Sequence, residues 1–256
     1  MIPRADTARR ALRGTVLPLA LLGAWILLSR SRTYSYAFVP IREIAHAFAE
    51  LTANGDLARG LFASLAKALI ALLLGAPSGI ALGALLGASR WVDRALGPAF
   101  HVIRQVPYLG LAPLIGLWFG GGDVAKILLV FLAVLFPMTL STYEGVRNVE
   151  PRLIEVAHVL KLDRRQVFVK VTLPSVLPYA YTGLSQAITF AWIATVGSEM
   201  LLHAGQGVGT LLQAAEAGGR IDSVLVCVLS VTVASVGIDR LLGYVGRRTM
   251  RWQRGT

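Results

Sequence analysis

The sequence predicts an all-α polytopic membrane protein with about six transmembrane helices, and three observations support this class. Its 256 residues are 55% hydrophobic and 15% charged, with a mean hydropathy of +0.63, whereas a soluble domain is about a quarter charged. Several apolar runs reach the ~20 residues that cross a bilayer as a helix. The positive charges gather at the ends of these runs, and no basic stripe interleaves with aromatic residues. The net charge of +11 therefore indicates membrane orientation, with no role in binding nucleic acid.

We expect residues 1–59 to form an N-terminal tail, a first transmembrane helix and an outer loop. Basic residues precede the apolar run at 16–28, as they do in a signal peptide, but no small-x-small cleavage site follows, so we predict an uncleaved span. Apolar spacing within the loop predicts a short amphipathic helix over 41–51.

The core is predicted over residues 60–246, followed by a basic tail at 247–256. Its spans are expected at 61–88, 100–119, 125–140, 176–200 and 223–244, with a short basic connection at 89–98 and a partial outer helix at 208–217. In the first of these spans, glycine recurs at Gly75, Gly79, Gly83 and Gly87. Small residues at that period let another helix approach closely. Lys67, near the outer end, is expected to snorkel to the interface.

Two later spans contain candidates for lining a transport pathway. Pro107 and Pro113 break the 100–119 span, and the backbone carbonyls that they free need protein or a water-filled cavity, so both a pathway helix and a kinked packing helix fit. His101 and Arg104 are expected at headgroup level. The 176–200 span carries Ser185, Gln186 and Thr189 in its interior and Glu199 at its end. These polar groups fit a polar passage or hydrogen bonds between helices, and Glu199 fits an outer gate or simple exposure to water.

A long polar segment at 144–178 lies between two apolar runs. The spacing of Ile154, Ala157 and Leu160 predicts one helix, and Asp163 is a plausible N-cap for a second helix over 164–171. Leu173 and Pro174 are expected to close this unit. Two short helices meeting at a charged turn form a docking surface for a soluble partner.

The same segment resembles the cytoplasmic signature of ABC-importer permeases. Glu155 and Ala157 occupy the first and third places of its Glu-Ala-Ala motif, and Val171, Leu173 and Pro174 match its Ile-x-Leu-Pro ending. Lys161 stands at the usual Gly position, so it either adopts a strained backbone or the turn is built differently. The stretches APLIGLWFG (112–120) and GSEML…GVGTLL (197–212) resemble the branch that handles nitrate, taurine and aliphatic sulfonates.

The resemblance implies the type I ABC-importer permease fold and several partners: a cytoplasmic ATPase dimer that binds ATP and Mg, a second permease copy in a homodimer, a periplasmic substrate-binding protein and membrane lipid. It implies a coupling loop over 143–175 that includes Glu155, Ala157, His158, Lys161, Leu162, Asp163, Val171, Leu173 and Pro174. The pathway candidates are Pro107, Pro113, Ser185, Gln186, Thr189 and Glu199.

The chain carries no phosphate-cradling loop, no metal-binding motif and no nucleophile elbow, so we expect no catalytic residue, no metal site and no bound cofactor. A stand-alone secondary transporter or channel is the alternative. Such proteins place ionisable residues near mid-membrane, and the spans are expected to be nearly free of them.

With six spans, both termini and the signature segment share one side. That side holds most of the Arg and Lys residues, Arg104 included, and the other side holds Arg30, Arg32, Arg42, Arg59, Lys126 and Arg220. The positive-inside rule therefore places the termini and the signature segment in the cytoplasm of a bacterium, with the chain in the inner membrane.

Overall fold

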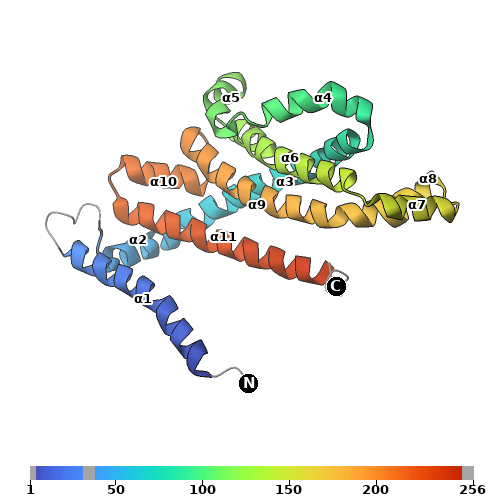
Figure 1. Ribbon diagram of the computed structural model, residues 1–256. Helices are drawn as coiled ribbons and strands as arrows, with labels where there is room; N and C mark the ends of the chain where they lie inside the picture. The colour runs from blue at the N-terminus through green and yellow to red at the C-terminus, as the bar shows by residue number, and fades with distance from the viewer. Residues whose placement is uncertain (1–3, 31–37, 250–256) are drawn as a thin grey trace.

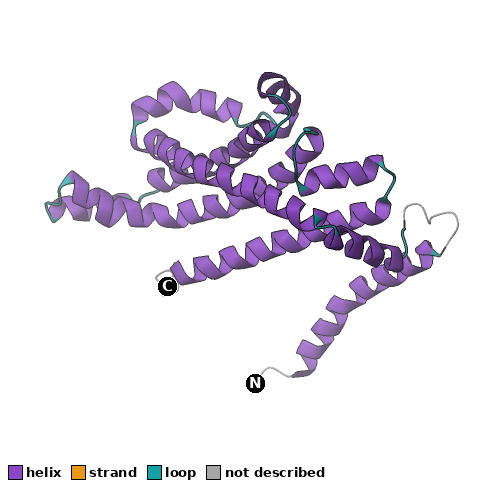
Figure 2. Cartoon of the chain, turned by 180° about the vertical axis from the view of Figure 1, so that it is seen from behind, coloured by secondary structure: helices purple, strands orange, loops and turns teal. Residues whose placement is uncertain are grey.

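The computed structural model describes residues 4–30 and 38–249, and over these ranges every regular element is a helix (Figures 1 and 2). The elements, in chain order, are α1 (Arg4–Ser29), α2 (Ile41–Ala53), α3 (Asp56–Ala88), α4 (Arg90–Ile103), the 3₁₀ turn η1 (Tyr108–Leu111), α5 (Ala112–Phe119), α6 (Asp123–Arg147), α7 (Pro151–Val159), α8 (Arg164–Val167), the π-helical turn η2 (Phe168–Thr172), α9 (Leu173–Leu201), α10 (Val208–Ala217) and α11 (Ile221–Thr249). The all-α prediction is confirmed, as are the amphipathic helix α2 and the partial helix α10. Of the predicted outer loop, residues 31–37 lie outside the described residues, as do residues 250–256 of the basic tail.

Helices α3, α6 and α9 form the centre of the molecule. A buried apolar cluster joins Ala71 of α3 to Val130, Val134 and Met138 of α6 and to a row of alanines on α9. Small residues dominate the α9 side of this cluster, which lets the three helix backbones approach closely. The core therefore relies on close backbone contact more than on large side chains.

The predicted glycine stripe on α3 lies directly against α6. A Cβ atom built on Gly75 would lie 2.8 Å from Val134 Cγ1, and one on Gly79 would lie 2.5 Å from Met138 Cβ. A Cβ on Gly83 would collide with Thr139 O, and one on Gly87 would lie 2.7 Å from Val146 Cβ. The prediction of tight helix packing is therefore confirmed, and the contact extends over about three turns.

The order of these contacts shows that α3 and α6 run parallel, since successive α3 glycines meet successive α6 residues. A parallel pair needs a return connection, and α4 with η1 and α5 supplies it across the top of Figure 1. The axis bends by 79° between Arg90–Ile103 and Tyr108–Phe119. The predicted span at 100–119 is thus a sharply bent pair of helices.

The basic connection predicted at 89–98 is wrong, because these residues begin helix α4. Ser89 caps that helix, with its Oγ accepting a hydrogen bond from Val92 N at 3.4 Å. The charged residues Arg90, Asp93 and Arg94 made this stretch look like a connection, but its amphipathic spacing is helical.

Three helices are long and apolar enough to cross a membrane: α3, α6 and residues 221–241 of α11. The bent pair adds a fourth if it counts as one span. Of the six predicted spans, α1 and α9 do not meet this measure within the described residues. Helix α9 has 29 residues, but its serines, threonines and prolines lower its hydropathy.

The shorter helices pack on one end of this core. Val226 of α11 joins α2 and α3 in a buried cluster with Ala47, Leu51 and Leu57. Arg220 pairs with both carboxylate oxygens of Glu50, at 3.0 and 2.7 Å, and these hydrogen bonds hold the pKa of Glu50 below its ordinary value. The α10–α11 turn is therefore tied to α2.

We predict that Gly79→Ala destabilises the protein, because the new methyl group cannot fit against Met138 without moving a helix. Overpacking of this kind costs about 1–3 kcal/mol, so the Tm of the purified protein in detergent should fall. Gly237→Ala is the matched control, since no atom lies within 4 Å of a Cβ at that helical position. Equal Tm values for the two variants would contradict the packing described above.

Candidate functional site

The segment between α6 and α9 folds as two short helices, α7 and α8, joined by a tight turn. We call residues 151–167 the elbow; in Figure 1 it projects from one end of the molecule. Lys161 is the one non-glycine residue with a positive φ in the described part of the chain, at 51°. Lys161 N donates to His158 O at 2.9 Å, and Leu162 N donates to Ala157 O at 3.0 Å. These two bonds define a Schellman motif, in which Lys161 occupies the position that glycine usually fills.

Of the two alternatives for Lys161, the structure therefore shows the left-handed backbone, and the turn has its ordinary construction. A left-handed residue with a Cβ costs about 1–2 kcal/mol. The lysine side chain is exposed, so no packing contact offsets this strain.

The second helix of the elbow begins as predicted. Asp163 Oδ1 accepts a hydrogen bond from Gln166 N at 2.7 Å, and Gln166 Oε1 accepts one from Asp163 N at 3.1 Å, which makes a capping box. The prediction that Leu173 and Pro174 close the unit is wrong. Helix α8 continues through η2 into α9, and Pro174 lies just after the π-helical turn η2 within this continuous helix.

The elbow leaves most of its apolar side chains in the open. Val156, Val159 and Leu160 are 55%, 81% and 64% exposed, and Glu155 and His158 are also exposed. Ala157 is buried, and Leu162 and Val171 are half-buried. The elbow thus presents a protruding surface of apolar residues surrounded by charges.

The pathway candidates on α9 separate into two kinds. Ser185 Oγ and Thr189 Oγ1 each donate to a backbone carbonyl of their own helix, those of Tyr181 and Ser185, both at 3.1 Å. Both hydroxyl groups are thus satisfied within α9, without a shared polar passage and without hydrogen bonds to another helix. Gln186, by contrast, lines a pocket of about 260 Å³ between α6, α9 and the α4–η1 break.

The same pocket is lined by Arg104, which was expected at headgroup level. That expectation is wrong, because the other lining residues include Phe136 and Pro137, near the middle of α6. The break after α4 folds the chain back over the bundle and carries Arg104 with it. Pro107 is the N-cap of η1, and Pro113 lies in the first turn of α5; both are exposed and neither lines this pocket.

A second polar site lies at the end of the bundle opposite the elbow. We call Lys67, Asp123, Lys126 and Glu199 the charge cluster. Lys67 Nζ lies 2.9 Å from Glu199 Oε1 and 3.3 Å from Asp123 Oδ1. Lys67 is 4% exposed, and Glu199 and Lys126 are fully buried. The expectations of a snorkelling Lys67 and of a Glu199 exposed to water are therefore wrong.

The charge cluster fastens the loop between α9 and α10. Glu199 accepts hydrogen bonds from Ser64 Oγ at 2.8 Å and from Gly209 N at 2.9 Å, and Ser64 Oγ accepts one from Val208 N at 2.9 Å. The Lys67 and Lys126 ammonium groups donate to the loop carbonyls of Gln206 and Ala204. The two lysines thus hold the α9–α10 loop, and Glu199 holds the first turn of α10, where a negative charge is favoured.

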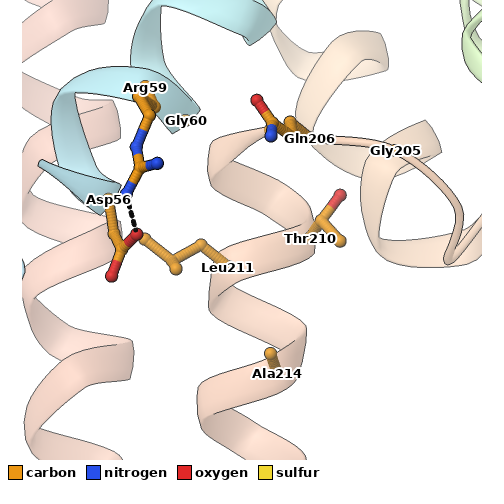
Figure 3. A pocket seen from close by; sticks show the side chains of 9 residues that line it. Asp56, Arg59, Gly60, Gly205, Gln206, Thr210, Leu211 and Ala214 are labelled. Atoms are coloured by element: carbon orange, nitrogen blue, oxygen red, sulfur yellow. Dashed lines mark hydrogen bonds and ion pairs between the residues drawn. The ribbon is translucent and has the colours of Figure 1, made fainter.

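An open pocket of about 240 Å³ lies beside this loop, with Gln206 and Thr210 on one side and α3 on the other (Figure 3). Its two charged lining residues, Asp56 and Arg59, pair with each other at 2.8 Å. The pocket therefore presents no unpaired charge to a ligand. No group of three or more His, Cys, Asp or Glu residues that could hold a metal occurs in the described ranges.

The sequence interpretation missed the burial of Lys67 and Lys126 and the partial burial of Arg104, and with it the ionisable groups inside the bundle. The expectation that the spans are nearly free of ionisable residues is therefore wrong. The sequence did contain a signal for the charge cluster, namely the Gly-rich loop that follows Glu199. In the structure, Gly207 of this loop lies so close to the Glu199 carboxylate that a Cβ would not fit.

We predict that Lys161→Gly stabilises the elbow by about 1 kcal/mol, since glycine adopts the left-handed backbone without strain. Lys161→Val should lower the Tm of the purified protein, because a β-branched residue adopts the left-handed backbone least readily. Lys170→Gly, in the helical turn that follows, is the control and should destabilise. A lower Tm for Lys161→Gly than for the unmodified protein would contradict this account.

We predict that Glu199→Gln costs about 3 kcal/mol, because it leaves Lys67 buried without its closest carboxylate. Adding Lys67→Met should recover part of this loss, which a double-mutant cycle of unfolding free energies in detergent measures. Glu150→Gln, at an exposed position, is the control and should have little effect. Strictly additive effects of the Lys67 and Glu199 changes would show that the pair is not coupled.

Comparison with known proteins places these features in a family. Residues 75–251 match the family described as "Binding-protein-dependent transport system inner membrane component". The nitrate import permease NrtB of Leptolyngbya laminosa is 32% identical, over 95% of this chain and 89% of its own. A protein named as the aliphatic sulfonates transport permease SsuC of Bacillus subtilis is 31% identical, over 94% of this chain and 88% of its own.

A solved structure supports the fold. The chain is similar to one from an inward-facing structure of the MetNI methionine ABC transporter, with a TM-score of 0.59 and 19% identity, over 77% of this chain and 95% of that one. At that identity the likeness concerns the fold alone, which is the permease fold that the sequence predicted.

The polytopic helical bundle, the elbow and these matches agree: the chain belongs to the family of inner-membrane permease components of binding-protein-dependent ABC importers, whose members are not themselves the ATP-hydrolysing subunits.

Proposed function

We propose that this permease forms the transport pathway for a small anion and that its elbow couples the pathway to a separate ATPase. The observation that carries the coupling is the elbow itself, which projects from the molecule (Figure 1) and leaves Val156, Val159 and Leu160 exposed. Exposed apolar groups among charges are typical of protein docking surfaces.

The connections of the elbow supply a mechanical reason for this proposal. Helix α6 leads into α7 through the buried Val149, and α8 continues as one helical segment into α9. A force on the elbow therefore acts on α6 and α9 together, which both border the central pocket. Rigid-body movement of this pair would open that pocket alternately to either side.

The charge of the elbow favours a cytoplasmic position. Arg152, Lys161, Arg164 and Arg165 of the elbow and Lys170 just after it are all exposed, and positive residues collect on the cytoplasmic side of a membrane protein. The same rule places both termini in the cytoplasm and the charge cluster at the outer face, where a substrate-binding protein would dock.

The proposed assembly contains two permease copies and two ATPase subunits, with ATP and Mg bound by the ATPases. Helices α4 and α5 leave large apolar groups exposed, among them Val102, Leu117 and Trp118 at 70%, 79% and 69%. We assign this face to the contact with a second copy and with lipid. For the solute, the names of the relatives indicate the class: nitrate for NrtB, aliphatic sulfonates for SsuC and bicarbonate for CmpB of Synechococcus elongatus.

We predict that Val159→Asp lowers the amount of ATPase that co-purifies with the permease by about tenfold or more, because a charge in the centre of a docking surface costs more than 1.4 kcal/mol. Val124→Asp is the matched control, since Val124 is 65% exposed at the opposite end of α6. Equal recovery of ATPase with both variants would sink the docking role.

In the same complexes, Glu155→Ala should reduce ATP hydrolysis that depends on the binding protein. An epitope tag in the elbow should be reached by antibody only after the membrane is opened. Labelling of that tag on intact cells would place the elbow outside and end the proposal.

A further inference from the structure

The pocket beside the α4–η1 break lies at the level of the bundle centre. Its lining includes Phe136 and Pro137 of α6, which at 1.5 Å per residue lie roughly 20 Å from Asp123 and roughly 16 Å from Arg147 along the helix. Gln186 and Phe190 line it from the middle of α9. The pocket is therefore far from both ends of the bundle.

Three polar side chains line this pocket: Arg104, Tyr108 and Gln186. The buried Nε atom of Arg104 has no hydrogen-bond partner. None of the ion pairs among the described residues involves Arg104. The guanidinium group thus brings a positive charge into the bundle without a carboxylate to balance it.

A positive charge near the bilayer centre is costly, about 2.5–3.5 kcal/mol even on insertion scales, and such residues usually pair or mark an ion pathway. The charge cluster at the end of the bundle shows how this chain treats buried lysines, since Lys67 is matched by Glu199. Arg104 has no such match, and the pocket next to it is open. Its volume of about 260 Å³ exceeds the ~30 Å³ share of one water molecule several times.

We propose that Arg104, together with Gln186 and Tyr108, binds the oxyanion group of the solute midway through the permease. This inference rests on the proposed transport function and deepens it by assigning a binding site and a charge class. A planar guanidinium group donates two parallel hydrogen bonds to an oxyanion, and the Gln186 amide and Tyr108 hydroxyl supply further donors.

The apolar walls of the pocket strengthen its preference for anions. Phe136 and Phe190 flank the polar groups and reduce the screening of the Arg104 charge by water. A cation in the same pocket would be repelled by the Arg104 charge, since no carboxylate is among the lining residues. The site therefore favours small anions with a flat or tetrahedral oxygen face over neutral or cationic solutes.

The test uses thiol chemistry in the complete transporter, with Cys227→Ala removing the native cysteine. Gln186→Cys places a thiol in the pocket, since Gln186 is exposed. Two reagents are compared, the anionic sulfonatoethyl methanethiosulfonate and the cationic trimethylammonioethyl methanethiosulfonate, with labelling followed by intact mass of this subunit. The quantity compared is the ratio of the anionic to the cationic labelling rate. We expect this ratio to be about tenfold higher with Arg104 present than after Arg104→Gln.

Thr189→Cys is the control, because Thr189 is exposed one turn along α9 and does not line the pocket. The rate ratio at this position should not change with Arg104→Gln. A ratio at Gln186→Cys that is unaffected by Arg104→Gln would overturn the inference, as would a complete lack of labelling there. Size-exclusion profiles and ATPase content identify any variant that fails to assemble.

Uptake into proteoliposomes separates this inference from the proposed function. With nitrate and methanesulfonate as probes, Arg104→Gln should reduce uptake at least tenfold and Arg104→Lys should restore it only in part, while ATP hydrolysis by the complex persists. Unchanged uptake in Arg104→Gln would refute the site and leave the transporter proposal standing. Absence of ATP-driven anion uptake in the unmodified complex would refute the proposed function, with the thiol ratios still testing the pocket.

Discussion

The close contact between α3 and α6 determines the path of the chain between them and, with it, the position of the central pocket. Gly75, Gly79, Gly83 and Gly87 bring α3 so near to α6 that no side chain fits on α3 at these four positions, and in a bilayer such close packing replaces the hydrophobic driving force that water would supply. Because the two helices run parallel, the chain must return between them. That return is the bent segment α4–η1–α5, which bends by 79° and carries Arg104 to the bundle centre. The central pocket therefore follows from the packing of two helices that do not contain Arg104.

The two ends of the bundle are built for different purposes. At one end, the charge cluster of Lys67, Asp123, Lys126 and Glu199 and the hydroxyl group of Ser64 fix the loop before α10, so this end is rigid and internally paired. At the other end, the elbow has few internal ties beyond a capping box and a Schellman turn, and its apolar groups are open. A paired end and an exposed end fit the proposed function, in which the elbow receives work from an ATPase and transmits it along α6 and α9. Lys161 adds strain in the elbow that glycine would remove, and nothing in the structure explains why lysine stands there.

Local signals in the sequence were sufficient for much of this molecule. Apolar runs, the four-residue glycine period, the Asp163 cap and the amphipathic spacing of α2 each depend on residues within one helix or turn, so they predicted most of the helices, the close helix contact and the start of the second elbow helix correctly. The signature residues also predicted the family, which the comparisons show. The predictions failed where partners are distant in the chain. Lys67 and Glu199 are 132 residues apart in sequence, and their pairing is invisible until α3 and α9 meet.

The sequence by itself determined that this chain is a helical membrane protein with a polar elbow between two long helices, because hydropathy and helix periodicity are properties of short segments. Only the tertiary structure decided which charged groups are buried and what they face. The snorkelling assigned to Lys67, the headgroup position assigned to Arg104 and the water exposure considered for Glu199 all assumed straight helices with charges at their ends. That assumption fails at the bend after Ile103 and where the α9–α10 loop folds onto the bundle. Both features bring charged groups inward, and both depend on backbone geometry that no local sequence pattern predicts.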